Sequence, residues 1–567
     1  MDGCRAAAAG ALRLAALSTR TQGPLRLGAG TRTGTSVWAQ RSLSEPAAAE
    51  PRRRLKSAAE LPGPSWFTTL YWLFIRGYGA RGHLLQCLQK RRYGPIWRSR
   101  FGPFQLVNVA SPRLIAQVIQ QEGRYPVRVE LPHWKEYRDL RGQAYGLHVD
   151  SGPEWHRIRS VLNPKMLRPR EVSAFAPVVQ TVVDDLLARL ELLRRRSPDG
   201  ATVPDLAAEL YKFGFEGISA VLFETRLGCL QEEIPADTLR FIAAVNDMLT
   251  LSDQVVLLPR WSRGLLPFWG RFVQAWDDLY GVAQKLVDRR MAELAAQPGG
   301  GGGGGEGMFL TYLLSSDRLS RGEVYISVTE LMLGGVDTTS NTLSWALYHL
   351  ARDRPAQNRL QAEVDAVCPD RQPPGAPHLA RMPYLRAVVK ETLRLYPVVH
   401  GNGRLVSENE VVVDGFWFPK KVGGGRAAAA ACLSVPLSVL TACLSLCPLQ
   451  TQFHLCHYAA SHDEVEFTAP EEFLPQRWLQ QESPSSHSGR ATPGFYHHHP
   501  YSFIPFGVGV RGCVGKRLAE MEMHLALSRV MQHYDVHPEV DSPLVEPKTR
   551  TLLIPSRPIN LRFLPRA

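Results

Sequence analysis

Apolar residues recur at helical spacing along most of the chain between residues 170 and 360. Positions three and four apart share one face of a helix, so the pattern predicts a mainly α-helical core. The stretch YGPIWRSRFGPFQLVNVASPRLIAQVI, residues 93–119, instead predicts two short strands followed by a helix. Another helix is predicted for LAEMEMHLALSRVM, residues 518–531. The chain is therefore expected to be mostly α with a small β region.

Composition indicates a globular protein with a large core. Of the 567 residues, 44% are hydrophobic and 21% charged, which excludes a largely disordered chain. The net charge of +13 suggests acidic partners or membrane surfaces. The nine cysteines form no CxxC pair, so we expect free thiols, a reducing compartment and no structural disulfide.

The first 45 residues have the composition of a targeting segment. They contain six arginines, no lysine, and Asp2 and Glu45 as their only acids. This predicts a mitochondrial transit peptide over residues 1–45, with a disordered basic tail as the alternative. Residues 46–64, which contain RRR and LPGP, are expected to form a basic Pro/Gly linker that orients the body against a membrane.

A glycine-rich loop, FGVGVRGCVG, places Cys513 just before a predicted helix. Glycines permit backbone angles and close approaches that a Cβ would block. Free N–H groups and the positive end of the helix dipole favour a thiolate at that place. Arg511 can grip a carboxylate such as a haem propionate bidentately. The pattern indicates a thiolate presented to haem iron, and the alternative is a buried structural thiol.

The loop fits Phe-x-x-Gly-x-Arg-x-Cys-x-Gly and resembles the haem-binding loop of the cytochrome P450 family. The resemblance implies a single-domain haem-thiolate fold over residues 65–567, a monooxygenase activity and haem b as cofactor. It implies Cys513 as the axial iron ligand. Further haem contacts are implied for five residues. Two of them, Trp155 and Arg159, belong to the block EWHRIR, and the others are Phe506, Arg511 and, more weakly, Arg404.

The segment ELMLGGVDTTSNTLSW, residues 330–345, predicts a long apolar helix interrupted by two glycines. Polar residues in such a helix need a reason. The segment resembles the oxygen-activating helix of the family, which implies Asp337 and Thr338 as the acid and alcohol that relay protons. The alternative is a hydroxyl that bonds back to a carbonyl of its own helix.

Two groups of charges complete the resemblance. Helical spacing alone makes Glu391 and Arg394 a modest surface pair. The resemblance implies instead a buried network of Glu391, Arg394 and Arg477 that braces the haem loop. Four cations are expected to dock an acidic [2Fe-2S] ferredoxin of the adrenodoxin type, itself reduced by an NADPH-dependent reductase: Arg386, Lys390, Lys516 and Arg517. A solvated helix face is the alternative for each.

Aromatic, aliphatic and cationic residues alternate in LLPRWSRGLLPFWGRF, residues 257–272. This composition suits an interfacial membrane contact, with plain helix–loop–helix packing equally open. With the targeting segment, it leads us to expect a peripheral protein on the matrix side of the mitochondrial inner membrane. Seven consecutive glycines, residues 299–305, predict a flexible surface loop.

Residues 422–450 do not fit the family pattern, which is continuous to Lys421 and resumes at Thr451. The segment begins with Val, ends with Gln and contains many residues with pyrimidine-rich codons, which suggests an in-frame retained intron. A genuine lineage-specific loop is the alternative. Its 23 uncharged residues, 427–449, are long enough to span a membrane, but a span there would divide the fold.

Longer blocks such as EGRYPVR, HWKEYRD and LYKFGFEGISAVLFETRLGCLQ resemble the vertebrate sterol 26/27-hydroxylase subfamily. The resemblance implies hydroxylation of the side chain of sterols, namely cholesterol, bile-acid intermediates and vitamin D, and no nucleic-acid partner. The alternatives are a 25-hydroxyvitamin D 1α-hydroxylase or a retinoid desaturase of the same group. A further alternative is that residues 422–450 make this chain a haem-free, inactive product.

Overall fold

The structure is a computed structural model. It describes residues 55–101, 104–129, 131–223, 225–256, 260–296, 309–406, 408–420, 451–479 and 498–566. Residues 55–567 form one compact unit. The predicted transit peptide, the run of seven glycines and the predicted insert lie outside the described residues.

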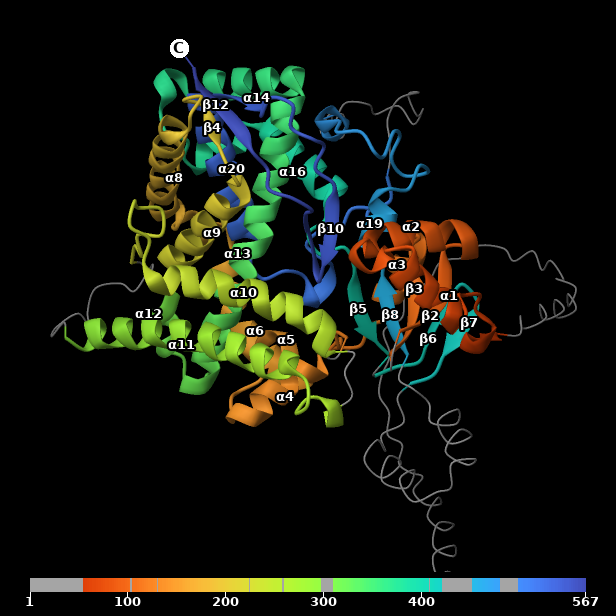
Figure 1. The fold of residues 1–567 in the computed structure, drawn as a ribbon. Helices are drawn as coiled ribbons and strands as arrows, with labels where there is room; N and C mark the ends of the chain where they lie inside the picture. The colour runs from red at the N-terminus through yellow and green to blue at the C-terminus, as the bar shows by residue number, and fades with distance from the viewer. Residues whose placement is uncertain are drawn as a thin grey trace, which may run out of the picture. The chain divides into compact units, whose positions relative to one another are not determined.

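Helices make up most of the unit, as the apolar spacing predicts (Figure 1). The helices that follow the first strands are α4 (Pro132–Arg141), α5 (Gly146–Val149), α6 (Gly152–Leu167), α7 (Pro169–Ser173), α8 (Ala176–Arg196), α9 (Leu206–Phe223), α10 (Ala236–Val255), α11 (Pro267–Ala295), α12 (Phe309–Leu314), α13 (Arg321–Arg352), α14 (Arg354–Val367), α15 (Ala376–Ala380), α16 (Pro383–Leu395), α19 (His457–Ser461) and α20 (Lys516–His533).

Helix α13 runs through the centre of the helical part and is buried along most of its length (Figure 1). It begins with a capping box in which Ser320 and Glu323 bond each other's backbone N–H. A helix that is apolar on all sides must be covered on all sides, and α13 packs against α9, α11, α5, α16 and α20. This packing fixes the segment that carries Asp337 and Thr338.

The strands form small sheets, and the predicted strand pair is confirmed. Its register is Ile96↔Val109, and helix α3 (Pro112–Gln120) follows as expected. One sheet has the order β2 (Ile96–Phe101), β3 (Phe104–Val109), β8 (Gln452–Leu455), β5 (Asn402–Leu405), and another has β1 (Lys56–Ser57), β7 (Phe416–Phe418), β6 (Val411–Val413). The rest are β4 (Thr202–Val203) with β12 (Leu561–Pro565) and β9 (Tyr534–Pro538), and the hairpin β10 (Pro547–Arg550), β11 (Leu552–Pro555).

The first of these sheets contains strands that lie before and after the predicted insert in the sequence. Strand β7 ends at Phe418, and β8 begins at Gln452, where it pairs with β3 and β5. Helices α1 (Trp66–Leu70), α2 (Gly82–Tyr93) and α3 (Pro112–Gln120) lie beside these strands (Figure 1). The compact unit begins at Leu55, inside the segment that the sequence suggests as a linker, because Lys56 and Ser57 pair in parallel with β7.

The turn between α10 and α11 exposes apolar side chains. Trp261 is 76% exposed and Leu265 is 77% exposed. Arg263, one of the cations of the 257–272 segment, is buried, where it pairs with Glu136 and lies 5.0 Å from the Trp269 ring. Among the described residues, none of the helices has the length and apolar character needed to cross a membrane.

Candidate active site

The loop before α20 closes on itself around Cys513. The Cys513 N–H donates to the carbonyl of Phe506 at 2.8 Å. Gly507 and Gly509 both have φ near +70°, the left-handed region that a glycine occupies without strain. The loop ends at Gly515, the N-cap of α20. Its sequence therefore specifies the turn that presents the sulfur.

The Cys513 residue is exposed, and four neighbouring groups act on its thiol. Desolvation raises the pKa of this thiol above its usual value, and the N–H groups of Gly515 and Lys516 and the charges of Arg159 and Arg128 partly offset that rise. The amides belong to the first turn of α20, whose N–H groups have no partner within the helix. The site can thus hold a thiolate as a metal ligand.

Two arginines, the buried Arg159 and the half-buried Arg128, lie behind the loop. Arg159, on α6, donates to the carbonyl of Gly512 at 2.7 Å, so it contacts the residue next to the cysteine. Arg128 donates to the carbonyl of Arg511 at 2.8 Å. The sequence analysis missed Arg128, although it lies in the block EGRYPVR, because no local spacing links it to a loop nearly four hundred residues away.

Arg511 stacks on Trp155, with its guanidinium carbon 3.5 Å from the ring centroid. Its Nε donates to the carbonyl of Pro126 at 2.7 Å. Burial and the neighbouring arginines lower the pKa of Arg511 to about 9. In this arrangement Trp155 supports the arginine.

Arg404 forms an ion pair with Glu122, at 2.5 Å between Nε and Oε1. Together with Arg159, Arg511 and the half-buried Arg128 it makes a mutually repelling group of cations. Nη1 of Arg511 and Nε of Arg128 are buried with no hydrogen-bond partner. Buried charges need counter-charges, so this group fits the two propionates of a haem held by Cys513.

Helix α13 carries the predicted acid and alcohol. Asp337 is buried, and desolvation raises the pKa of its carboxyl, while Arg550 and Tyr211 oppose that rise. The Thr338 hydroxyl donates to the carbonyl of Gly334 at 2.7 Å, which is the back-bonded geometry that the sequence left open. Gly334 is exposed although it lies mid-helix, and no atom lies within 4 Å of the position a Cβ would take.

A buried carboxylate joins α13 to the haem loop. Glu330 accepts hydrogen bonds from the N–H groups of Leu147 (2.6 Å) and His148 (3.2 Å), at the start of α5. Gly146 has φ +76°, and a Cβ there would lie 2.7 Å from the Glu330 carboxylate, so a side chain is excluded. Just after α5, the Asp150 carbonyl accepts from Arg511. Sequence analysis did not identify Glu330 as functional.

The predicted bracing residues meet in one buried cluster. Glu391 pairs with Arg394 at 2.8 Å and with Arg477 at 3.1 Å. Its carboxylate also accepts from the Trp478 indole at 2.9 Å and from the Leu474 N–H at 3.0 Å. The two contacts from Leu474 and Trp478 were not predicted. The cluster fixes α16 against the segment after α19.

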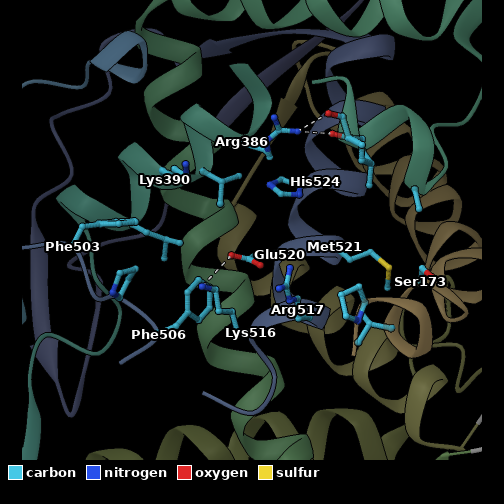
Figure 2. A pocket seen from close by; sticks show the side chains of 18 of the residues that line it. Ser173, Arg386, Lys390, Phe503, Phe506, Lys516, Arg517, Glu520, Met521 and His524 are labelled. Atoms are coloured by element: carbon cyan, nitrogen blue, oxygen red, sulfur yellow. Dashed lines mark hydrogen bonds and ion pairs between the residues drawn. The ribbon is translucent and has the colours of Figure 1, made fainter. Parts of the chain in front are cut away.

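The four predicted docking cations line one hollow of about 840 Å³, bordered by α16, α20 and the haem loop (Figure 2). Arg386 donates to the carbonyls of Leu379 and Ala380, and Lys516 lies 4.0 Å from Glu520. Lys516 and Arg517 are exposed. A further exposed cation, Arg170 on α7, lines the same hollow and was not predicted.

Comparison with known proteins places this geometry in a family. The cytochrome P450 family model matches residues 61–422 and 446–563, so 423–445, inside the predicted insert, lies outside both matched ranges. The mitochondrial sterol 26-hydroxylase of Rattus norvegicus is 41% identical over 561 residues, 98% of each chain. The mitochondrial 25-hydroxyvitamin D-1 alpha hydroxylase of Homo sapiens is 41% identical over 517 residues, 90% of this chain and 93% of that one.

Among solved structures, the haem domain of cytochrome P450DA matches with a TM-score of 0.66 at 20% identity, over 90% of this chain and 97% of that chain. This likeness shows the fold, and it agrees with the mostly helical unit described above. The chain belongs to the cytochrome P450 family and is a haem b monooxygenase.

Proposed function

We propose that this protein is a mitochondrial monooxygenase that hydroxylates the side chain of sterols, with cholesterol, bile-acid intermediates and vitamin D as the substrate class. The observation that carries the substrate class is the 41% identity to a sterol 26-hydroxylase over 98% of both chains. The reaction consumes the substrate, dioxygen, two electrons and two protons, and yields the alcohol and water.

The residues behind the loop support Cys513 as the iron ligand. The haem, when bound, supplies oxygen activation, and the thiolate ligand favours cleavage of the O–O bond. Arg159 and Arg128 stabilise the negative sulfur. The unpartnered nitrogens of Arg128 and Arg511 would bind propionate, and Trp155 keeps the Arg511 plane in place.

Asp337 and Thr338 would deliver the protons. Because burial raises the pKa of Asp337, its carboxyl can hold a proton at a higher pH than an exposed aspartate. The Thr338 hydroxyl would pass that proton to the reacting dioxygen when it leaves the Gly334 carbonyl. The exposed face at Gly334 provides space for the small reactant beside them.

Electrons would come from an acidic [2Fe-2S] ferredoxin that docks on the hollow of Figure 2 and is itself reduced by an NADPH-dependent reductase. The exposed cations Arg170, Lys516 and Arg517 favour an acidic partner. On the same proposal, residues 1–45 direct the chain to mitochondria. Trp261 and Leu265 would contact the matrix side of the inner membrane peripherally.

A second candidate is 25-hydroxyvitamin D 1α-hydroxylation. It is favoured by the human relative of that name, which is also 41% identical over 517 residues. A retinoid desaturase of the same group is a weaker alternative. Under either alternative, the proposed haem site and ferredoxin-docking hollow are unchanged. Substrate identity alone separates these candidates.

The test uses the chain without residues 1–45, expressed with and without residues 422–450. We expect the reduced carbon monoxide complex of the shorter version to give the red-shifted Soret band of a thiolate ligand, and Cys513→Ala to lose it. Absence of the band from both versions would overturn the haem-thiolate assignment. A band from the shorter version alone would support 422–450 as a retained intron.

Turnover then decides the substrate. The protein that gives the band is supplied with ferredoxin, reductase and either cholesterol or 25-hydroxyvitamin D, and products are identified by mass spectrometry. Side-chain hydroxylation of cholesterol is the expected result. Hydroxylation of 25-hydroxyvitamin D at C1 without any cholesterol product would favour the second candidate, and turnover without ferredoxin would contradict the proposed electron donor.

A further inference from the structure

The buried acid on α13 has a cationic partner that comes from the far end of the chain. Nη2 of Arg550, the last residue of β10, lies 3.4 Å from Oδ2 of Asp337. The Arg550 side chain is 13% exposed and that of Asp337 is 3% exposed, so the contact is shielded from water. A shielded pair interacts more strongly than a surface pair.

Helix α10 holds the same arginine from the other side. Nη1 of Arg550 donates to Oδ1 of Asn246, on α10. The next residue, Thr551, donates its N–H to Asp253 at 3.0 Å and its hydroxyl to the same carboxylate at 2.7 Å, and Asp253 also belongs to α10. The turn of the β10–β11 hairpin is therefore attached to α10 by three side-chain contacts.

The backbone at this turn is strained. Thr551 has φ +50°, a left-handed conformation that a β-branched residue rarely adopts. Such strain persists where surrounding contacts impose it and is common at functional sites. Here the contacts of Thr551 with Asp253 and with the Leu249 carbonyl impose it, and they fix the backbone from which Arg550 extends.

The guanidinium of Arg550 faces three titratable groups from three helices. They are Asp337 on α13, Asp253 on α10 and Tyr211 on α9. Burial raises the pKa of both carboxyls, and Arg550 opposes that rise in each case. The Tyr211 hydroxyl also accepts a hydrogen bond from Asn341 at 3.0 Å, so its own position is fixed.

We propose that Arg550 is a positioning residue for proton delivery: it fixes the Asp337 carboxyl between α13 and α10. The inference rests on the proposed role of Asp337 and Thr338. The role assigned to Arg550 requires no contact with the substrate or the reacting oxygen. Arg550 acts through Asp337. Without the Arg550 guanidinium, the Asp337 carboxyl loses its fixed orientation, and its ionised form loses a favourable electrostatic interaction.

The test compares Arg550→Gln with Arg550→Lys and with the control Lys548→Gln, which removes an exposed cation from the same strand. The holoenzyme is assayed for product formed per dioxygen consumed, for hydrogen peroxide release and for kcat against pH. We expect Arg550→Gln to lower the product yield per dioxygen at least about fivefold. Arg550→Lys should stay within about twofold of the parent and Lys548→Gln should equal it.

The pH profile separates positioning from a merely structural role. Loss of the cation raises the pKa of Asp337 further, so the limb of kcat that reports this carboxyl should move to higher pH in Arg550→Gln. The reduced carbon monoxide band and substrate affinity should be unchanged. Arg550→Met, which fills a similar space without charge, replaces the Gln variant if that one does not fold.

The variant Asp337→Asn distinguishes failure of the inference about Arg550 from failure of the proposed role of Asp337. If Asp337→Asn releases peroxide while Arg550→Gln has the parent's yield and pH profile, the inference about Arg550 is overturned and the role of Asp337 stands. If Asp337→Asn itself couples dioxygen to product like the parent, the proposed proton delivery by Asp337 fails, and the inference fails with it.

Discussion

Two buried carboxylates in this protein have different surroundings. Glu391 accepts hydrogen bonds from five donors: both ends of the Arg394 fork, Arg477, the Trp478 indole and the Leu474 N–H. Asp337, also buried, lies 3.4 Å from one arginine and near the hydroxyl of Tyr211. Hydrogen-bond donors and cations surround the Glu391 carboxylate, whereas the Asp337 carboxylate has few such partners.

The difference shows how burial can serve two purposes. A carboxylate surrounded by donors is held in one place, so it can join segments of chain that are distant in sequence. A buried carboxylate with few donors can exchange a proton at moderate cost, which a proton relay needs. Glu391 fits the first case and Asp337 the second. The predictions below test this contrast, from the largest expected effect on stability to the smallest.

Removal of Glu391 should be the most damaging change. Glu391→Ala leaves the buried Arg394 and the half-buried Arg477 without their carboxylate, so we expect a loss of about 3–5 kcal/mol in the free energy of unfolding, and poor haem incorporation. Thermal or urea unfolding measures it. The matched control is Glu293→Ala, which removes a partly exposed carboxylate that pairs with Arg289 and Arg290 and should change stability by less than about 1 kcal/mol. Equal effects of the two variants would contradict the contrast.

The carboxyl of Glu522 should make stability fall as pH rises. Glu522, on α20, is buried with Oε1 unpartnered, and burial raises its pKa from 4.5 to about 8. The folded protein thus keeps a proton that the unfolded chain releases between these pH values. Its contribution to stability is full below pH 4.5 and is lost as pH rises through 8, at up to about 1.4 kcal/mol per pH unit.

Glu522→Gln has no such proton. Its melting temperature should therefore fall less between pH 6 and pH 8 than that of the parent, with the gap between the two proteins widening toward pH 8. The haem spectrum recorded at both pH values serves as the control for an intact site. Parallel melting curves of the two proteins across this range would show that Glu522 is compensated in a way similar to Glu391.

Neutralising Asp337 should hardly affect stability. Asp337→Asn keeps the volume and removes a buried charge, so the lost attraction to Arg550 is offset by a smaller desolvation cost. We expect the free energy of unfolding to change by less than about 1 kcal/mol while peroxide release rises. Stability is measured on the same preparation as coupling. A loss as large as that of Glu391→Ala would mean that Asp337 is a structural carboxylate.

An exposed cation should affect association and leave stability unchanged. Arg517→Glu places a negative charge on the hollow of Figure 2, so the KM for an acidic ferredoxin should rise about threefold at low salt and approach the parent's value at high salt. Lys548→Glu, an exposed cation on β10, is the control. A KM that is unaffected at low salt would remove Arg517 from the docking surface.

Local motifs could be predicted, while contacts between distant segments could not. The haem loop was predicted because its glycines, Arg511 and Cys513 occupy ten consecutive residues and specify a turn by backbone geometry alone. Arg550 and Tyr211 were missed, because neither has a spacing that relates it to Asp337, 213 and 126 residues away respectively. They meet only when α9, α13 and the β10–β11 hairpin pack together.

The sequence by itself determined the helical core, the strand pair at 96–109, the loop that presents Cys513 and the family to which the chain belongs. Tertiary structure decided which charges are buried and what they face. It turned Arg263 inward, stacked Arg511 on Trp155 and gave Asp337 a partner from the last hairpin. The reason is physical: backbone geometry follows from neighbouring residues, whereas desolvation and ion pairing depend on the whole set of segments that surround a group.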